Sequence, residues 1–134
     1  MQQSSLPAAL SPSPLPPSGS ISLTDWLNYM QGIHVSAIDM GLERVIPVFQ
    51  ALGITQTDAF VFTVAGTNGK GSTTATIAEI CQQAGYKTAL YQSPHLLVFN
   101  ERVRINGKMV DDQTLIDAFA TIEQARIDCG LTLS

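Results

Sequence analysis

The chain has few charged residues and no cluster of basic ones. Only 13% of its 134 residues are charged against 45% that are hydrophobic, and the net charge is −4. A composition this apolar argues against intrinsic disorder. The shortage of basic side chains argues against nucleic acid or an anionic membrane surface as a partner. The length suits one folded unit with a modest core.

Long apolar runs and a basic amino-terminal stretch are also missing. No segment approaches the roughly 20 apolar residues needed to cross a bilayer. Residues 1–20 contain no lysine or arginine that could begin a signal peptide. Cys81 and Cys129 stand far apart in apolar surroundings, which predicts free, buried thiols rather than a disulfide. These absences together predict a cytoplasmic protein.

What is present begins with a change of composition near residue 21. Residues 1–20 are rich in proline and serine, which predicts a disordered leader before a folded part spanning 21–134. Apolar spacing in the folded part predicts a helix with Ser22 or Thr24 as N-cap that breaks near Gly32, and helices over residues 42–52 and about 70–84. A last helix is predicted between Asp111 or Asp112 and Gly130. Pro47 leaves two alternatives for the second helix, which either kinks there or begins just before it.

Four short segments predict strands. Residues 60–65, FVFTVA, form an apolar run typical of a strand buried on both faces of a parallel sheet, and residues 88–91 predict the next strand. Residues 102–105 and 108–110 flank Asn106-Gly107, a strong signal for a tight hairpin. Strand, glycine-rich turn, helix and strand in this order predict an α/β fold with a P-loop-type parallel sheet and flanking helices.

The glycine-rich turn carries the clearest chemistry. It contains Gly66, Gly69 and Gly71, and its full sequence is Gly66-Thr67-Asn68-Gly69-Lys70-Gly71-Ser72-Thr73. Glycines let backbone amides approach a ligand closely, and the following helix N-terminus adds partial positive charge, so we expect an anion there. Lys70 would neutralise the terminal phosphates of a nucleotide, and the hydroxyl of Ser72 or Thr73 could ligate an accompanying Mg²⁺.

The spacing departs from the usual GxxxxGK[ST] pattern, because Gly71 separates Lys70 from Ser72. The alternative interpretation is a glycine-rich turn between strand and helix with a solvated lysine. The order of strand, loop, lysine, hydroxyls and helix favours phosphate binding.

Several separated blocks of the chain resemble one enzyme family. Residues 60–90, FVFTVAGTNGKGSTTATIAEICQQAGYKTAL, look like the nucleotide loop of folylpolyglutamate synthase/dihydrofolate synthase, in the Mur ligase superfamily. Upstream, residues 26–27, 33–34 and 38–45 match the opening of these enzymes. Downstream, residues 93–96 and 100–107 match their next blocks. The resemblance covers about residues 22–132, so only the leader falls outside it.

The resemblance implies a ligase that uses ATP and Mg²⁺. Such enzymes phosphorylate a carboxylate of pteroate or folate, and the amino group of glutamate then attacks the acyl phosphate. Residues 67–70 would hold ATP, with Lys70 catalytic, and Ser93 falls at a family Mg²⁺ position. Gly32, Ile33, His34 and Val35 fall where the pterin is contacted. On residue chemistry alone, Ser93 is a turn serine, and His34 and His95 are either substrate contacts or hydrogen-bonded structural residues.

The resemblance also implies that parts of the enzyme have no counterpart in the chain. We expect residues 21–134 to be an incomplete, N-terminal portion of a Mur-ligase-like ATPase domain, without the glutamate-binding domain and inactive alone. The parent enzyme is expected to be monomeric, with dihydropteroate or folate, glutamate and ATP as partners. The alternatives are a cell-wall precursor ligase and a vestigial nucleotide-binding module.

Overall fold

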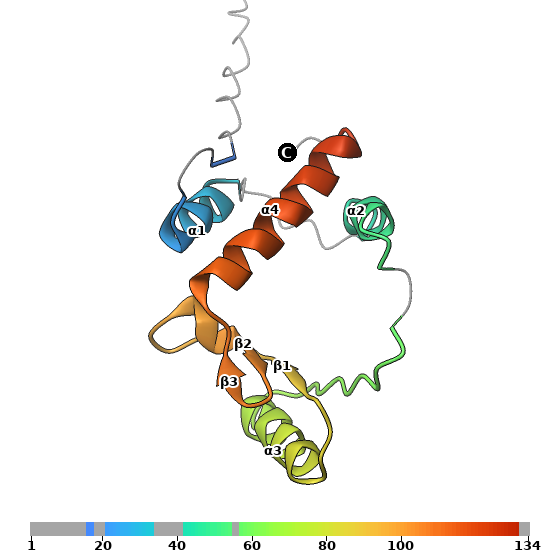
Figure 1. Cartoon of the computed structure of the whole chain (residues 1–134), viewed down its shortest axis with the longest axis vertical. Helices are drawn as coiled ribbons and strands as arrows, with labels where there is room; N and C mark the ends of the chain where they lie inside the picture. Colours follow the sequence, from blue (N-terminus) through green and yellow to red (C-terminus); the bar gives the residue numbers. More distant parts are fainter. Residues whose placement is uncertain (1–15, 18–20, 34–41, 55–56, 132–134) are drawn as a thin grey trace, which may run out of the picture.

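The computed structural model describes residues 16–17, 21–33, 42–54 and 57–131. These residues form the helices α1 (Leu23–Gly32), α2 (Val45–Ala51), α3 (Lys70–Gln83) and α4 (Asp112–Asp128), and a short 3₁₀ helix, η1 (Phe99–Arg102). The strands are β1 (Ala89–Tyr91), β2 (Val103–Ile105) and β3 (Lys108–Met109). In Figure 1, α1 and α2 flank the long α4, and α3 lies with the strands at the opposite end. The predicted leader lies almost entirely outside the described residues.

The predicted helices form where the capping signals place them. Ser22 begins α1 through a capping box: its Oγ accepts from the Asp25 amide at 3.2 Å, while its own amide donates to Asp25 Oδ2 at 2.9 Å. Asp111 begins α4 by accepting from the Thr114 amide at 2.8 Å. Gly130 follows α4 with a φ of +65°, as the predicted end of that helix requires.

Pro47 lies near the start of α2 and does not kink it. The helix begins at Val45, two residues before the proline. In the first turn of a helix a backbone N–H has no partner within the helix, so proline loses nothing there. The alternative in which the helix begins just before Pro47 is therefore correct.

The hairpin predicted at Asn106-Gly107 is confirmed. Both residues adopt positive φ, +48° and +78°, as a tight two-residue turn between twisted strands requires. The turn pairs Ile105 with Lys108 across β2 and β3. The Asn106 side chain also accepts from the Thr88 amide at 2.9 Å, which ties the turn to the chain entering β1.

The sheet differs from the predicted parallel one. Its order is β1-β2-β3, and both pairs are antiparallel. Residues 60–65 are assigned to no strand, and Phe60 is 95% exposed. A run of this kind becomes a buried strand only where neighbouring strands pair with it and helices cover its faces. Among the described residues nothing pairs with it, so the predicted parallel pairing is corrected for this part of the chain.

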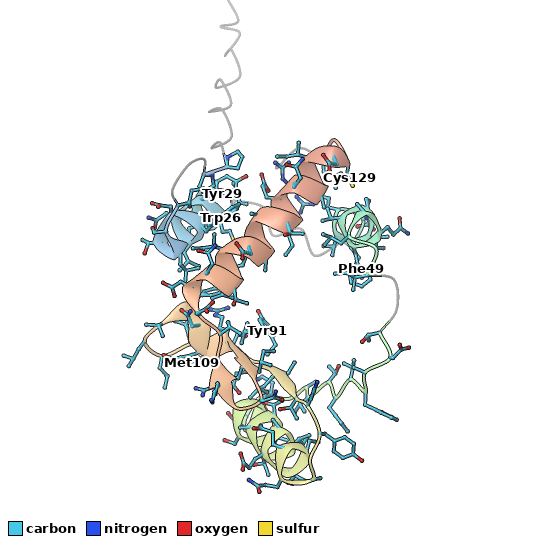
Figure 2. The ribbon with its side chains drawn as sticks, in the orientation of Figure 1. Trp26, Tyr29, Phe49, Tyr91, Met109 and Cys129 are labelled. Atoms are coloured by element: carbon cyan, nitrogen blue, oxygen red, sulfur yellow. The ribbon has the colours of Figure 1, made fainter. Side chains whose placement is uncertain are left out.

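The core lies between α1 and α4. The buried apolar side chains among the described residues are Leu23, Trp26, Tyr29, Leu115 and Ala125. Trp26 and Tyr29 point from α1 toward α4 (Figure 2), and their rings meet edge to face with centroids 5.9 Å apart. The Trp26 ring also lies 6.1 Å from that of Phe119 on α4. Aromatic packing thus joins segments more than 90 positions apart in the sequence.

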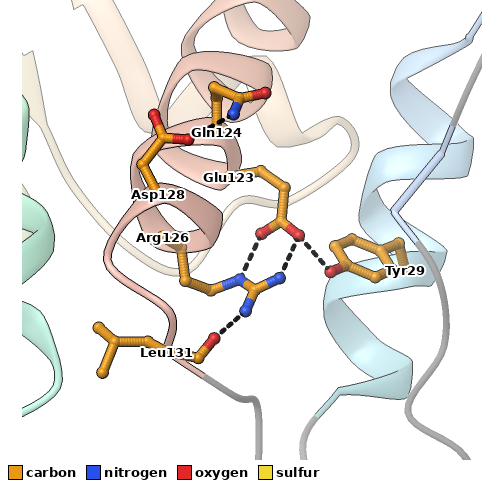
Figure 3. Close-up of polar contacts among 6 residues, drawn as sticks. All are labelled: Tyr29, Glu123, Gln124, Arg126, Asp128 and Leu131. Carbon is orange, nitrogen blue, oxygen red and sulfur yellow. Dashed lines mark hydrogen bonds and ion pairs between the residues drawn. The ribbon is translucent and has the colours of Figure 1, made fainter.

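One buried carboxylate completes this interface. Glu123 on α4 accepts a 2.7 Å hydrogen bond from the Tyr29 hydroxyl and two from Arg126, from Nε at 2.8 Å and Nη2 at 2.7 Å (Figure 3). Arg126 also donates to the Leu131 carbonyl. The guanidinium holds the pKa of Glu123 below its ordinary value. Burial and the neighbouring carboxylate raise the pKa of Tyr29 to about 12.

Two further predictions concern cysteines and membrane spans. Cys81 and Cys129 are both free, as predicted, but they are half-buried rather than fully buried. Cys129 lies at the surface between α4 and α2, where its Sγ is 3.5 Å from the Pro47 carbonyl oxygen. Among the described helices, none combines the length and apolar character needed to span a bilayer.

Candidate functional site

The glycine-rich turn ends where α3 begins. Residues 67–69 form a bend, and α3 starts at Lys70, so residues 66–73 are not one continuous helix. Gly69 is the N-cap and adopts left-handed backbone geometry, with a φ of +77°. Side chains rarely tolerate that conformation, so glycine is required at this position.

The first amides of α3 are available to a ligand. Thr73 donates to the Gly69 carbonyl at 2.9 Å, which is the first helical hydrogen bond of α3. The amides of Lys70, Gly71 and Ser72 have no acceptor among the described residues, and no side chain caps this end. Unpaired amides and the partial positive charge of a helix N-terminus form an anion-binding arrangement. The backbone therefore has the form that phosphate binding requires.

The Lys70 side chain folds over the same turn. Its Nζ donates to the Gly66 carbonyl at 2.5 Å and lies 3.5 Å from the Thr67 carbonyl. Both acceptors are neutral. A phosphate oxygen is a stronger acceptor for an ammonium group than a carbonyl is, so an anion in the loop can draw Lys70 toward itself.

A small cavity joins this turn to the end of β1. Its volume is about 170 Å³, and it is lined by Val64, Lys70, Gly71, Thr74, Tyr91, Gln92 and Ser93. Ser93, predicted as a metal ligand, thus shares a cavity with Lys70, as the phosphate-binding hypothesis needs. Thr74, Tyr91 and Gln92 were missed by the sequence interpretation. Thr74 could have been found, because it lies one helical turn after Lys70 on the same face.

Two of the predicted hydroxyl ligands, Ser72 and Thr73, follow Lys70 and Gly71 in the first turn of α3. The cavity lining includes neither Ser72 nor Thr73. Ser72 uses its carbonyl to accept from Thr76 Oγ1 at 2.9 Å, inside the helix. Among the described residues, no three His, Cys, Asp or Glu side chains gather as a metal site. The residues present would fit a metal held mainly by nucleotide phosphates and water, with the Ser93 hydroxyl in the same cavity lining as Lys70.

The loop after Ser93 is held by one carboxylate. Glu101 accepts from the amides of Leu96, Leu97 and Val98 at 2.8, 2.8 and 2.9 Å. These three hydrogen bonds lower the pKa of Glu101 to about 2. The Glu101 carboxylate therefore fixes the loop that follows the cavity by accepting hydrogen bonds from three of its backbone amides.

His95 lies within this loop as a hydrogen-bonded residue. Its Nδ1 accepts from Arg102 Nε at 2.9 Å, and its ring lies 5.7 Å from that of Phe99. The Arg102 guanidinium also lies over the Phe99 ring, 4.9 Å from its centroid. Of the two interpretations open for His95, the structure supports the structural one. His34 lies outside the described residues.

The predicted pterin segment is described only in part. Gly32 is the last residue of α1, and the Ile33 amide donates to the Tyr29 carbonyl at 3.1 Å to close the helix. His34 and Val35 lie outside the described residues. A larger hollow of about 560 Å³ lies between α2 and α4, lined by residues that include Ala51, Thr121 and Asp128. It contains none of the predicted site residues.

Comparisons with curated proteins agree on one kind of enzyme. The chain is 47% identical over 116 residues to the dihydrofolate synthase/folylpolyglutamate synthase of Escherichia coli, which covers 87% of this chain and 28% of that protein. It is 42% identical over 113 residues to the enzyme of the same name from Buchnera aphidicola, covering 84% of the chain and 26% of that protein. No protein-family model matches the chain.

Solved structures give the same result. Escherichia coli FolC in complex with DHPP and ADP matches with a TM-score of 0.78 and 46% identity, over 87% of this chain and 28% of that one. The Yersinia pestis bifunctional folylpolyglutamate synthase/dihydrofolate synthase, complexed with AMPPNP and a Mn ion, matches with a TM-score of 0.78 and 42% identity over the same shares.

These matches confirm the resemblance and the α/β fold class expected from the sequence. The chain is similar to folylpolyglutamate synthase/dihydrofolate synthases over most of its own length. It spans about 28% of the length of the Escherichia coli relative.

Proposed function

We propose that this chain is the ATP-binding part of a ligase that joins L-glutamate to dihydropteroate or to folylpolyglutamate. One observation carries the proposal: the free amides at the start of α3, the Lys70 ammonium and Ser93 meet at one cavity, in a chain 47% identical to a dihydrofolate synthase/folylpolyglutamate synthase. Solved relatives bound to ADP with DHPP, or to AMPPNP with L-glutamate, support the same set of small molecules.

The chemistry of amide formation explains why such a ligase needs a phosphate site. A carboxylate is a poor electrophile until one of its oxygens becomes a leaving group. Transfer of the terminal phosphoryl of ATP to the carboxylate of the pteroate or folate supplies that leaving group. The glutamate amine then attacks the acyl carbon, and inorganic phosphate departs. Positioning and neutralising the phosphates is the protein's main task in the first step.

Each residue of the glycine-rich turn has a role in that task. The amides of Lys70, Gly71 and Ser72 hold the polyphosphate. The bend that exposes these amides is formed by Gly66, Thr67, Asn68 and Gly69. The Thr73 amide makes the first helical hydrogen bond of α3. Lys70 is the catalytic residue, since its ammonium group neutralises the transferring phosphoryl. Ser93, with Ser72 as the second candidate, would hold Mg²⁺, which supplies further charge neutralisation when bound.

The proposal extends to the other ligands and to the cell compartment. Residues 32–35 contact the pterin, and the partners are small molecules, not nucleic acid or a membrane. The enzyme works as a monomer in the cytoplasm, where the free thiols of Cys81 and Cys129 are stable.

A nucleotide-binding module without catalysis is the second candidate. One observation favours it: the cavity is lined by residues of the glycine-rich turn, α3 and the end of β1, all of which a nucleotide-binding site would use without a second substrate. Both candidates share the ATP site. They differ in whether a pteroate also binds.

The test is calorimetric titration of the purified chain with Mg²⁺ and AMPPNP. We expect saturable binding that Lys70→Ala weakens by at least about tenfold, because a charge-assisted contact to phosphate is lost. Lys108→Ala, which removes a lysine on β3 outside the cavity lining, is the control and should leave binding unchanged. Equal affinity in the wild type and Lys70→Ala would contradict the ATP site.

A second titration separates the two candidates. Dihydropteroate should raise the melting temperature of the chain if it is part of the folate ligase, because ligands stabilise only the states that they bind. A nucleotide sugar should not raise it. Stabilisation by nucleotide alone favours the module, and stabilisation by the nucleotide sugar favours a cell-wall ligase.

A further inference from the structure

We propose that Gln92 contacts the third phosphate of ATP and makes the site prefer ATP over ADP. The inference rests on the proposed ATP site and adds a specificity-determining residue to it. Gln92 was not among the residues that the sequence indicated. Its position, its orientation and its unpaired amide nitrogen carry the argument.

The backbone of Gln92 is held by the sheet. Its amide donates to the Arg102 carbonyl at 3.0 Å, directly after the last residue of β1. Its side chain is half-buried and lines the cavity together with Lys70 and Ser93. The polar side chain of Gln92 therefore lines the same cavity as Lys70 and Ser93, and its backbone is held by the sheet.

The orientation of the side-chain amide follows from its neighbours on α3. Gln92 Oε1 lies 3.4 Å from Thr74 Oγ1, and a Cβ placed on Gly71 would come within 3.9 Å of it. The oxygen end thus faces the first turn of α3. The hydrogen bonds of Gln92 among the described residues involve its backbone amide and its Oε1, and none involves the two hydrogens of the nitrogen end. A half-buried donor without an acceptor beside Lys70 suits an anionic oxygen.

The contact with Thr74 does not account for Gln92 by itself. The Thr74 hydroxyl has nearer acceptors in its own helix, the Gly71 carbonyl at 3.0 Å and the Lys70 carbonyl at 3.1 Å. Its single hydrogen is therefore shared among three acceptors, of which Gln92 Oε1 is the most distant. The 3.4 Å contact to Gln92 orients the amide but is too long to be a main tie between α3 and β1.

The place of Gln92 across the cavity indicates which phosphate it meets. The free amides of residues 70–72 lie on the α3 side, whereas Gln92 and Ser93 lie on the β1 side. In phosphate-binding loops the backbone amides take the inner phosphates, and the lysine reaches the outer ones. A donor that reaches the cavity from the end of β1, outside the row of loop amides and in the same lining as the lysine, therefore meets the terminal phosphoryl. ADP lacks that group.

The test compares two nucleotides on the same variants. Calorimetric titrations with Mg²⁺ use AMPPNP and ADP, on the wild type and on Gln92→Leu. We expect Gln92→Leu to weaken AMPPNP about tenfold, the loss of one hydrogen bond to a charged group, and ADP less than about twofold. Gln50→Leu, which removes an exposed glutamine from α2, should change neither affinity.

Gln92→Glu provides a second variant of the same shape. Its carboxylate repels the terminal phosphoryl, so it should weaken AMPPNP more than Gln92→Leu does, again with a smaller change for ADP. If circular dichroism shows that Gln92→Leu is unfolded, Gln92→Glu decides the question. Equal weakening of both nucleotides, or an unchanged ratio, would overturn the role of Gln92.

The Lys70→Ala arm separates failure of this inference from failure of the ATP site. If the wild type binds nucleotide in a Lys70-dependent way and Gln92 variants keep its preference for AMPPNP, only the role of Gln92 is wrong. If the wild type binds neither nucleotide, both proposals are wrong.

Discussion

Two regions of the molecule are stabilised by different means. The helical group, α1, α2 and α4, contains every side chain that is buried among the described residues, namely Leu23, Trp26, Tyr29, Leu115, Glu123 and Ala125. The loop group, consisting of residues 57–110 with α3 and the strands, contains none. The candidate ATP site lies entirely in the loop group.

The loop group is ordered by backbone chemistry rather than by a core. Gly69 and Asn106-Gly107 supply the positive φ angles of its turns, and Glu101 pairs with three amides. Its apolar side chains meanwhile lie exposed, Phe60 and Ile80 among them. The difference teaches that the turns and loops around this site are locally encoded, whereas the buried side chains that resist unfolding belong to the helical group. Regions with few buried contacts open most easily.

The largest expected effect tests where the stability lies. Trp26 is 4% exposed and contacts Tyr29 and Phe119. Trp26→Ala should lower the free energy of unfolding by about 3–5 kcal/mol, because it removes a large buried ring and leaves a cavity. Phe60→Ala is the matched change in the loop group and should shift it by less than about 0.5 kcal/mol. Urea unfolding followed by circular dichroism measures both. Similar losses of unfolding free energy for Trp26→Ala and Phe60→Ala would contradict the assignment of stability to the helical group.

The next effect concerns the charged cluster between α1 and α4. Glu123→Gln should lower the free energy of unfolding by about 2 kcal/mol, because Arg126 and the Tyr29 hydroxyl lose the charge of a buried carboxylate partner. Glu79→Gln on α3 removes an exposed carboxylate whose hydrogen bond among the described residues comes from Gln83, and should cost less than about 0.5 kcal/mol. Chemical denaturation at neutral pH gives both values, and a cost for Glu79→Gln equal to that for Glu123→Gln would contradict the assignment.

The smallest effect sharpens the comparison on the loop side. The pKa of Glu101 is lowered from 4.5 to about 2, so its contribution is complete above pH 4.5 and is lost as the pH falls toward 2. Hydrogen exchange by NMR should show the protection factors of the amides of residues 96–98 falling roughly tenfold across that pH range. Glu101→Gln should remove the protection at every pH. The Thr73 amide, which bonds a backbone carbonyl, is the internal control; a parallel loss there would indicate general unfolding instead.

The local features of the fold could be predicted from the sequence, because they depend on residues close together in the chain. Ser22 and Asp111 cap their helices, and Asn106-Gly107 forms its turn, as their patterns indicated. Gly69 adopts the left-handed geometry that the phosphate-loop hypothesis required. Residues 60–65 were misjudged, since whether an apolar run becomes a strand depends on partners that the run does not contain.

The candidate site shows the same division. The sequence indicated Lys70, the glycines around it and the hydroxyl of Ser72 or Thr73, but Ser93 only through a family resemblance. Ser93 could be placed beside Lys70 only by the structure, and Gln92 had no sequence signal at all. The role assigned to Glu101, which lies beyond the loop that it fixes, was also invisible in the pattern.

The sequence by itself determined the glycine-rich turn, the helix ends and the hairpin, because each follows from the φ and ψ preferences and hydrogen bonds of near neighbours. Only the tertiary structure decided that Tyr29 meets Glu123 across 94 positions, that Gln92 and Ser93 face Lys70, and that residues 60–65 remain unpaired. These outcomes depend on how whole elements pack against one another, and no short stretch of sequence contains that information.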